Sequence, residues 1–503
     1  MSARPMDPTD ADGAAETRRA VRNVLTLGGS LILTLGIAIA MRVLLPRHLG
    51  PERFGALTSA DALTTAAFIV LELGADIYVR KHVSVRAGHA SDFFGGVLAL
   101  RVMAAALVTG AMALFMAITH RPAELRALVY LLSAAQLLIH MNATLSALLH
   151  AKGEVSAMSA LSVVAKLVWA AMTLAAVLAA APLWTFALAA LASESLRSVV
   201  LLGLARRHLG LIVRLDPRAT RLMVVSSLPY YLNTFATTAY GKLDITLLSL
   251  RAGTREVGWY AAAAAVAGLT LLLAPLLGWV LMPTFARAAA QSRDALLSRI
   301  RGATMQVLTL AIPASFLVAL GADRWVSMLF GAAFAPAALS LRILAVTFVL
   351  TYLNILYAIT LTILDRPWTL TLISGCGLVV NVALNLGLVP QTLRLLGDGG
   401  GGAGCAMATL GTELFVTTAM LTVVGREAFD RDTAIMVAKH LAATAAALGL
   451  GQVTGATGMA RLLIVSGAYV ALVMGTGAVR LGTMTSAVVD AVRARSPLSA
   501  QRR

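Results

Sequence analysis

The chain has 503 residues, of which 59% are hydrophobic and 13% are charged, and its mean hydropathy is +0.82. A soluble domain carries about a quarter charged residues, so this composition excludes an ordinary soluble enzyme and predicts a membrane protein. The net charge of +17 does not predict a nucleic-acid partner, because the basic residues gather in loops between apolar segments. Cys376 and Cys405 lie in or beside apolar segments, so we expect no disulfide framework, metal site or cofactor.

Residues 1–23 are hydrophilic and form an expected cytoplasmic tail. The apolar run that follows is too long for a signal-peptide core, so we expect a retained helix. A bilayer core about 30 Å thick needs roughly 20 apolar residues per helix, and nearly all of the remaining chain divides into such segments. The pattern predicts an all-α membrane protein of about fourteen transmembrane helices, at residues 24–45, 56–79, 93–118, 127–149, 157–180, 183–204, 222–250, 259–282, 303–320, 341–364, 369–389, 404–424, 435–451 and 462–479.

The most basic internal loop predicts how these helices are grouped. It spans residues 205–221 and separates an N-terminal lobe of six helices, 24–204, from a C-terminal lobe of six, 222–424. Even numbers make the lobes parallel repeats, and the charged, glycine-containing turns at 49–55 and 254–260 are a weak internal echo. Two further helices at 435–479 and a cytoplasmic tail at 480–503 complete the predicted organisation. We expect the glycine run 399–402 to be a flexible connector.

The loops also predict the orientation. With the N-terminus inside, the cytoplasmic segments hold about 25 Lys and Arg residues and the opposite loops about 9. We therefore expect a multi-pass protein of the inner membrane with both termini in the cytoplasm.

Ionisable residues within the predicted helices are the candidate site, because a charge at mid-bilayer costs about 2.5–3.5 kcal/mol. Arg and Lys suit phosphate ligands, since charge-assisted hydrogen bonds are about twice as strong as neutral ones. The candidate substrate-binding cations are Arg42, Arg101, Lys166 and Lys242.

Five acids accompany these cations. Intramembrane carboxylates often hold a coupling proton or cation, but they also neutralise nearby cations, and the sequence leaves both roles open. These acids are Asp61, Glu72, Asp76, Asp244 and Glu413.

Lys166 is the strongest candidate, because it lies near the middle of its helix with no acid within a turn. Trp169 follows at i+3 on the same face, and an aromatic ring beside a cation suits a ligand with sugars next to phosphate. The alternative, weighted equally, is a lysine satisfied by carbonyls or by an acid from another helix. For Glu194 and Arg197, also at i+3, mutual neutralisation is the favoured interpretation.

The seventh predicted helix is unusually polar. Lys242 and Asp244 are two residues apart and point to different faces, so we expect no direct pair. Tyr230, Tyr231 and Asn233, earlier on this helix, are candidate sugar contacts, although interfacial tyrosines explain them equally well.

Two stretches of the sequence resemble a known family, the polysaccharide transporters of the multidrug/oligosaccharidyl-lipid/polysaccharide (MOP) superfamily. The first is 42–55 (RVLLPRHLGPERFG) with Glu72-Leu73-Gly74 and Arg80. The second comprises Pro229, 242–244 (KLD), 256–260 (EVGWY) and Met282-Pro283. One departure is that Glu72 stands where the family usually has Asp.

This resemblance implies two six-helix lobes around a central, partly cationic cavity that includes Arg42 of the first helix. It also implies alternating access, which carries an undecaprenyl-pyrophosphate-linked glycan from the cytoplasmic to the outer leaflet. The implied partners are the lipid-linked glycan, membrane lipids, and a polysaccharide polymerase with its co-polymerase.

Three other functions remain open. One is a cation-coupled exporter of small molecules on the same scaffold, for which twelve helices would suffice. Another is a membrane polysaccharide polymerase or ligase, against which the short outer loops and the lack of a nucleophile–base arrangement argue. The third is a structural assembly partner, in which the central charges would be dispensable.

Overall fold

Every element in the described part of the chain is helical in the computed structural model, which describes residues 8–73, 90–120, 122–151 and 155–478. Contacts divide the chain into two units. The first comprises Met1–Ala261 and Leu329–Ala333, and the second Ala262–Met328 and Phe334–Arg503. Within the described residues, eleven helices are long and apolar enough to cross a membrane.

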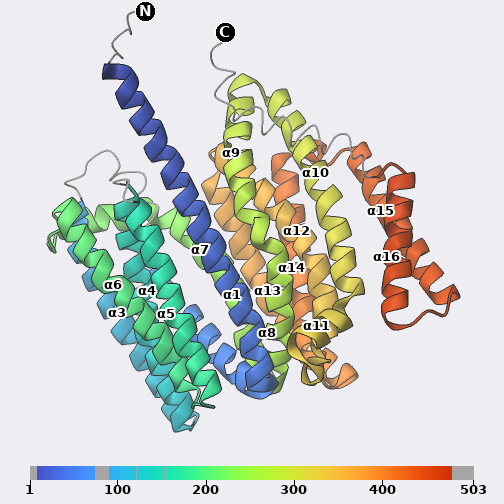
Figure 1. Ribbon diagram of the computed structural model, residues 1–503, viewed down its shortest axis with the longest axis horizontal. Coiled ribbons are helices and arrows are strands. Elements are labelled where there is room, and N and C mark those ends of the chain that lie inside the picture. Colours follow the sequence, from blue (N-terminus) through green and yellow to red (C-terminus); the bar gives the residue numbers. More distant parts are fainter. Residues whose placement is uncertain (1–7, 74–89, 121, 152–154, 479–503) are drawn as a thin grey trace, which may run out of the picture. The chain divides into compact units, whose positions relative to one another are not determined.

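The first unit begins with a long helix that covers the helix predicted at 24–45 and the first part, to Phe68, of the one predicted at 56–79. It bends at Gly50, whose φ of 72° is outside the helical range, and it reaches back into the predicted tail. The elements of this unit, drawn in blue to green in Figure 1, are α1 Pro8–Phe68, η1 Ile69–Leu71, α3 Ala90–Ile118, α4 Ala123–Ala151, α5 Val155–Leu178, α6 Trp184–Leu209 and α7 Pro217–Arg251.

The helix predicted to run to residue 79 ends earlier, which corrects the prediction. A 3-10 turn closes at Leu71, and Leu73 has a φ of 52°, a value that a leucine in a helix does not adopt. Arg101 accounts for this end, because its guanidinium donates to the carbonyls of Leu71 and Glu72. Such carbonyls have no partner within the helix itself.

Only residues 210–216 of the predicted basic linker lie between helices. Gly210 ends α6 in the left-handed conformation with a φ of 58°, as is common for glycine after a helix. Asp216 caps α7 by accepting from the backbone N–H of Arg218 at 2.8 Å, and Pro217 occupies the first helical position, where its missing N–H costs nothing.

The second unit contains the remaining elements: the end of α8 Thr254–Leu269, η3 Thr270–Leu273, α9 Ala274–Gln291, α10 Arg293–Leu320, α11 Ala322–Phe330, η4 Ala332–Phe334 (its last residue), α12 Ala337–Ile363, α13 Pro367–Leu396, α14 Gly400–Val424, η5 Arg426–Ala428, α15 Arg431–Val453 and α16 Gly458–Gly475. Its main core joins α9, α10, α12 and α14 around the fully buried Phe285 and Tyr357.

Three predictions for this region need correction. The helix predicted at 259–282 is interrupted by η3. The segment 321–340, expected as a loop between the predicted helices 303–320 and 341–364, contains α11 and η4. The glycine run is no flexible connector: Gly400 to Gly402 are buried in the first turn of α14, and a Cβ at Gly400 would lie 2.4 Å from the Thr392 carbonyl oxygen. Glycines allow this close approach of two helices.

Candidate functional site

Lys166 lies on α5 in the first unit and is half-buried. Its ammonium nitrogen is 3.9 Å from the centroid of the Trp169 ring, which is within cation–π range. The contact predicted at i+3 is therefore present. Among the described residues, no carboxylate comes within ion-pair distance of Lys166.

Two more cations surround Lys166. Arg42 of α1 and Arg197 of α6 are close enough to interact with it electrostatically, as is the carboxylate of Glu194. Helix α5 packs against both α1 and α6, so the grouping follows directly from the fold. Three cations and one carboxylate give this cluster a formal charge of +2. We call Arg42, Lys166, Glu194 and Arg197 the cationic cluster.

Glu194 and Arg197 form the expected ion pair, with Arg197 Nη1 at 3.1 Å from Glu194 Oε1. Asn142 of α4 donates to Glu194 Oε2 at 2.8 Å and accepts from the Ser198 hydroxyl at 2.8 Å. Arg197 Nε is nevertheless buried and has no hydrogen-bond partner in the described part of the chain. A buried donor without an acceptor costs about 1–3 kcal/mol, so the ion pair with Glu194 does not use the whole hydrogen-bonding capacity of Arg197.

Lys242 has a carboxylate partner. Its Nζ lies 3.3 Å from Asp61 Oδ2 of α1, and the two side chains are 35% and 46% exposed. Asp244 is buried, and the Tyr260 hydroxyl donates to it at 3.3 Å. Lys242 and Asp244 thus have different partners, in agreement with their predicted faces.

Arg101 is 2% exposed and is held by protein oxygens. Its guanidinium donates to the carbonyls of Leu71 at 2.8 Å and His140 at 2.6 Å, and to the Thr144 hydroxyl at 2.8 Å. This geometry fits a residue that joins α3, α4 and the end of η1. Its phosphate-binding role stays a prediction.

The remaining acids fall in three places. Glu72, beside η1, pairs with His140 Nδ1 at 3.1 Å. In the second unit, buried Glu413 of α14 accepts a short hydrogen bond from Asn354 of α12. Asp76 lies outside the described residues.

Trp169, the candidate sugar contact beside Lys166, is on α5, and the other three candidates are on α7. The Tyr231 ring lies 6.1 Å from that of Phe235 in a tilted arrangement, and Asn233 is part of the same helix. The side chain of Tyr230 lies outside the described residues. The sugar-binding role of these three residues stays a prediction.

Solved structures with the same fold are transporters and flippases. The lipid II flippase MurJ, in an inward closed conformation, matches with a TM-score of 0.65 at 12% identity, over 90% of this chain and 98% of that one. An inward-facing multidrug resistance MATE family transporter of the MOP superfamily matches with 0.60 at 16% identity, over 78% and 94%. A point mutant of the MATE transporter VcmN from Vibrio cholerae matches with 0.54 at 13% identity, over 81% and 99%.

The chain therefore has the all-α fold that the flippase MurJ and these MATE transporters share. The family model for polysaccharide biosynthesis proteins matches residues 20–289, which is more than half of the chain, and the chain belongs to that family. No match was found among curated proteins. The resemblance seen in the sequence is confirmed by this family match, and the solved structures that share the fold are a lipid II flippase and MATE transporters.

Proposed function

We propose that this protein moves undecaprenyl-pyrophosphate-linked oligosaccharide or polysaccharide repeat units from the cytoplasmic to the outer leaflet of the inner membrane. The movement proceeds by alternating access and serves surface polysaccharide biosynthesis. Membership of the polysaccharide biosynthesis family and the MOP fold support this class of activity.

The observation that carries the proposal is the net formal charge of +2 on the four residues of the cationic cluster. A pyrophosphate offers anionic oxygens to Lys166 and an acceptor to the buried Nε of Arg197, and arginine binds such groups with paired hydrogen bonds. Binding the negatively charged pyrophosphate of the substrate at this cluster offsets the free-energy cost of keeping cations inside a bilayer.

Trp169 supports the choice of a glycan over a simple phosphate. Its ring contacts the Lys166 ammonium, and an indole next to the phosphate subsite presents a flat apolar face to a sugar ring. Transport also requires that the substrate bind the inward-open and outward-open states unequally, since a ligand shifts an equilibrium only through differential affinity. Asp61 pairs with Lys242, and Glu194 pairs with Arg197. In one of these states the pyrophosphate of the substrate displaces these carboxylates or binds the same cations beside them.

The test is deletion of the gene in a strain without a second family member, followed by leaflet-specific detection of the lipid-linked glycan. We expect the glycan lipid to accumulate on the cytoplasmic leaflet and the wild-type gene to restore outer exposure. Lys166→Ala should restore at most about a tenth of the wild-type rate, because it removes a charge-assisted contact.

Lys439→Ala is the matched control. This lysine is half-buried on α15 in the second unit, donates to the Thr476 carbonyl at 2.8 Å, and is not part of the cationic cluster, so we expect full restoration. Normal outer exposure in the deleted strain would refute the proposal. Increased sensitivity to cationic drugs with unchanged glycan exposure would instead favour a small-molecule exporter, an activity that MATE transporters of this fold carry in their name.

A further inference from the structure

A cavity of about 860 Å³ lies within the second unit, between the C-terminal hairpin α15–α16 and helices α10, α11 and α12. The hairpin packs on α10, where Phe316 stacks on Tyr469 with ring centroids 4.2 Å apart. The cavity lies beside this ring contact, and Phe316 is one of the residues that line it. Its volume falls in the range of sites that hold a small organic molecule.

The walls of the cavity are apolar along most of its length. Leu320 of α10, Val346 and Val349 of α12, and Leu441 and Leu448 of α15 line it. Val346 and Leu441 are 48% and 63% exposed, so an apolar occupant would cover hydrocarbon surface that the protein itself leaves open. Acyl chains have this character, and a sugar or a hydrophilic metabolite does not.

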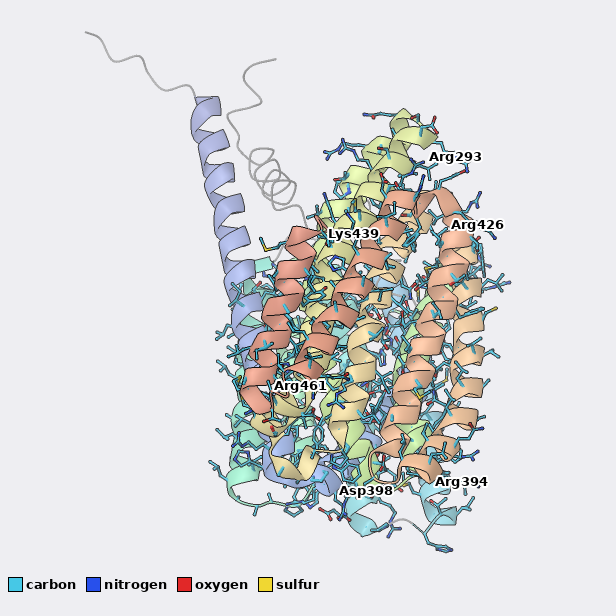
Figure 2. All side chains as sticks on the ribbon, turned by 90° about the vertical axis from the view of Figure 1, so that its right-hand side faces the viewer. Arg293, Arg394, Asp398, Arg426, Lys439 and Arg461 are labelled. Carbon is cyan, nitrogen blue, oxygen red and sulfur yellow. The ribbon has the colours of Figure 1, made fainter. Side chains whose placement is uncertain are left out.

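Three arginines from three helices meet at one end of the cavity: Arg324 of α11, Arg342 of α12 and Arg461 of α16. Arg342 forms an ion pair with Asp323. The Arg324 guanidinium lies against the backbone where α16 begins, because a Cβ at Gly458 would lie 3.0 Å from its Nη2. Figure 2 shows Arg461 on α16, toward the end of this unit that also holds Arg394 and Asp398.

Arg324 and Arg461 have no acidic partner in the described part of the chain. One carboxylate against three guanidinium groups leaves a formal charge of +2 at the end of an apolar groove. Guanidinium groups match phosphate oxygens in geometry and charge, and basic pockets between membrane helices are typical sites for anionic lipid headgroups.

We propose that this cavity binds a membrane phospholipid with an anionic headgroup, whose phosphate lies among Arg324, Arg342 and Arg461 and whose acyl chain follows the groove. The site is on helices that contain none of the cationic cluster, and it does not depend on the proposed substrate. The occupant is a resident lipid that fastens the hairpin to α10 and α12, rather than a passenger.

The test measures the lipids bound to the purified full-length protein by native mass spectrometry, after equilibration with equimolar phosphatidylglycerol and phosphatidylcholine. We expect the wild-type protein to retain phosphatidylglycerol at least about tenfold over phosphatidylcholine, since each arginine near a headgroup contributes about 1 kcal/mol. The double variant R324Q/R461Q should lose this preference.

Two controls make the result specific. Arg394→Gln removes an exposed arginine at the same end of the unit but outside the cavity, and it should keep the preference. Leu441→Trp fills the groove with all three arginines in place, and it should lower retention of phosphatidylglycerol. Equal retention of both lipids by the wild type, or equal losses in R394Q and R324Q/R461Q, would overturn the proposal. The proposal would also be overturned if inorganic phosphate displaced the bound lipid at the same concentration as phosphatidylglycerol does. The apolar groove would then contribute nothing to the affinity for the lipid.

Discussion

Arg101 is a buried cation whose guanidinium group donates hydrogen bonds to acceptors within the protein. Lysine at this position would keep the charge but present its donors from a single point, so it could not reach the Leu71 and His140 carbonyls and the Thr144 hydroxyl together. We expect Arg101→Lys to lower the free energy of unfolding by roughly 3 kcal/mol, because buried acceptors lose charged donors.

Thermal unfolding of the purified protein in detergent measures this loss. Arg394→Lys is the control, since Arg394 is exposed near the end of α13, and it should change the unfolding free energy by less than about 0.5 kcal/mol. Wild-type stability in Arg101→Lys would show that the observed hydrogen bonds add little.

Sequence reasoning found residues whose interactions are local and missed those that depend on distant partners. Trp169 beside Lys166 and Glu194 beside Arg197 follow from helical spacing alone. The partner of Lys242 is 181 residues away, and no periodicity points to it. The hydrogen bonds that join Asn142 of α4 to Glu194 and Ser198 of α6 depend on how these helices pack, which is equally invisible in one sequence.

At the scale of elements, the bend within α1 and the start of α8 contact each other through two glycines. A Cβ at Gly55 would lie 1.8 Å from the Thr254 carbonyl oxygen, and one at Gly258 would lie 1.9 Å from that of Pro51. The two segments noted as an internal echo thus approach backbone to backbone. Beside them, exposed Arg255 and Glu52 are 3.8 Å apart, a pair of small energetic value.

We expect Gly55→Ala and Gly258→Ala each to destabilise the first unit by roughly 1–3 kcal/mol, because a methyl group at either position must push two backbones apart. Gly253→Ala is a close control, since a Cβ there meets no atom within 4 Å, and it should unfold like the wild type. The measurement is the midpoint of thermal unfolding in detergent. Equal unfolding midpoints for all three variants would show that the close backbone contacts at Gly55 and Gly258 do not contribute to stability.

The start of α15 offers a pH-dependent prediction outside the membrane-spanning segments. Hydrogen bonds to Asp430 from the backbone N–H and the hydroxyl of Thr433, at 2.9 and 2.7 Å, lower the pKa of this carboxyl below its ordinary value. A lowered folded-state pKa means that the cap stabilises fully above the unfolded-state pKa and is lost as pH falls through the folded-state value.

Asp430→Ala should therefore cost about 1 kcal/mol at neutral pH, and the difference from the wild type should shrink in acid. Protection of the Thr433 amide from hydrogen exchange, compared between the two proteins at each pH, reports this directly. A difference that is constant down to strongly acidic pH would exclude the ionised carboxylate as the cap.

The elements that sequence reasoning placed best are the uniformly apolar ones. The predicted helices at 127–149, 341–364 and 404–424 coincide with α4, α12 and α14 to within a few residues. The failures are the polar or irregular stretches, because hydropathy cannot show a 3-10 interruption such as η3 or a short helix such as α11. At Gly400, composition suggested a linker where the glycines in fact permit close helix packing.

For the whole molecule, the all-α MOP fold was predictable from hydropathy and motif resemblance, whereas the number of spans was not. One apolar stretch, Gly28–Leu71, overlaps both of the first two predicted helices, 24–45 and 56–79. Helix α7 and the stretch from α8 to α9 are not among the eleven apolar helices of the described residues; α7 contains Lys242 and Asp244, and η3 breaks the other. Fourteen spans and the limits of the two lobes therefore stay predictions.

The orientation in the membrane is testable within the second unit. Figure 2 shows Arg293 and Arg426 toward one end of this unit and Arg394 and Asp398 toward the other. The excess of Lys and Arg in the loops at the first end predicts that it faces the cytoplasm. In a protein whose two cysteines, Cys376 and Cys405, are replaced by alanine, single cysteines can be placed at the exposed positions Asp398 and Arg293.

We expect a membrane-impermeant thiol reagent to label Asp398→Cys in intact spheroplasts and Arg293→Cys only after permeabilisation. The reason is physical, since the basic loop that contains Arg293 resists translocation while the shorter, less basic loop at Asp398 does not. Labelling of Arg293→Cys alone in intact cells would invert the topology, and the arginine-lined end of the cavity would then face the cytoplasmic leaflet. Because Arg461 lies toward the same end as Asp398, this one experiment also assigns the leaflet from which the resident lipid is drawn.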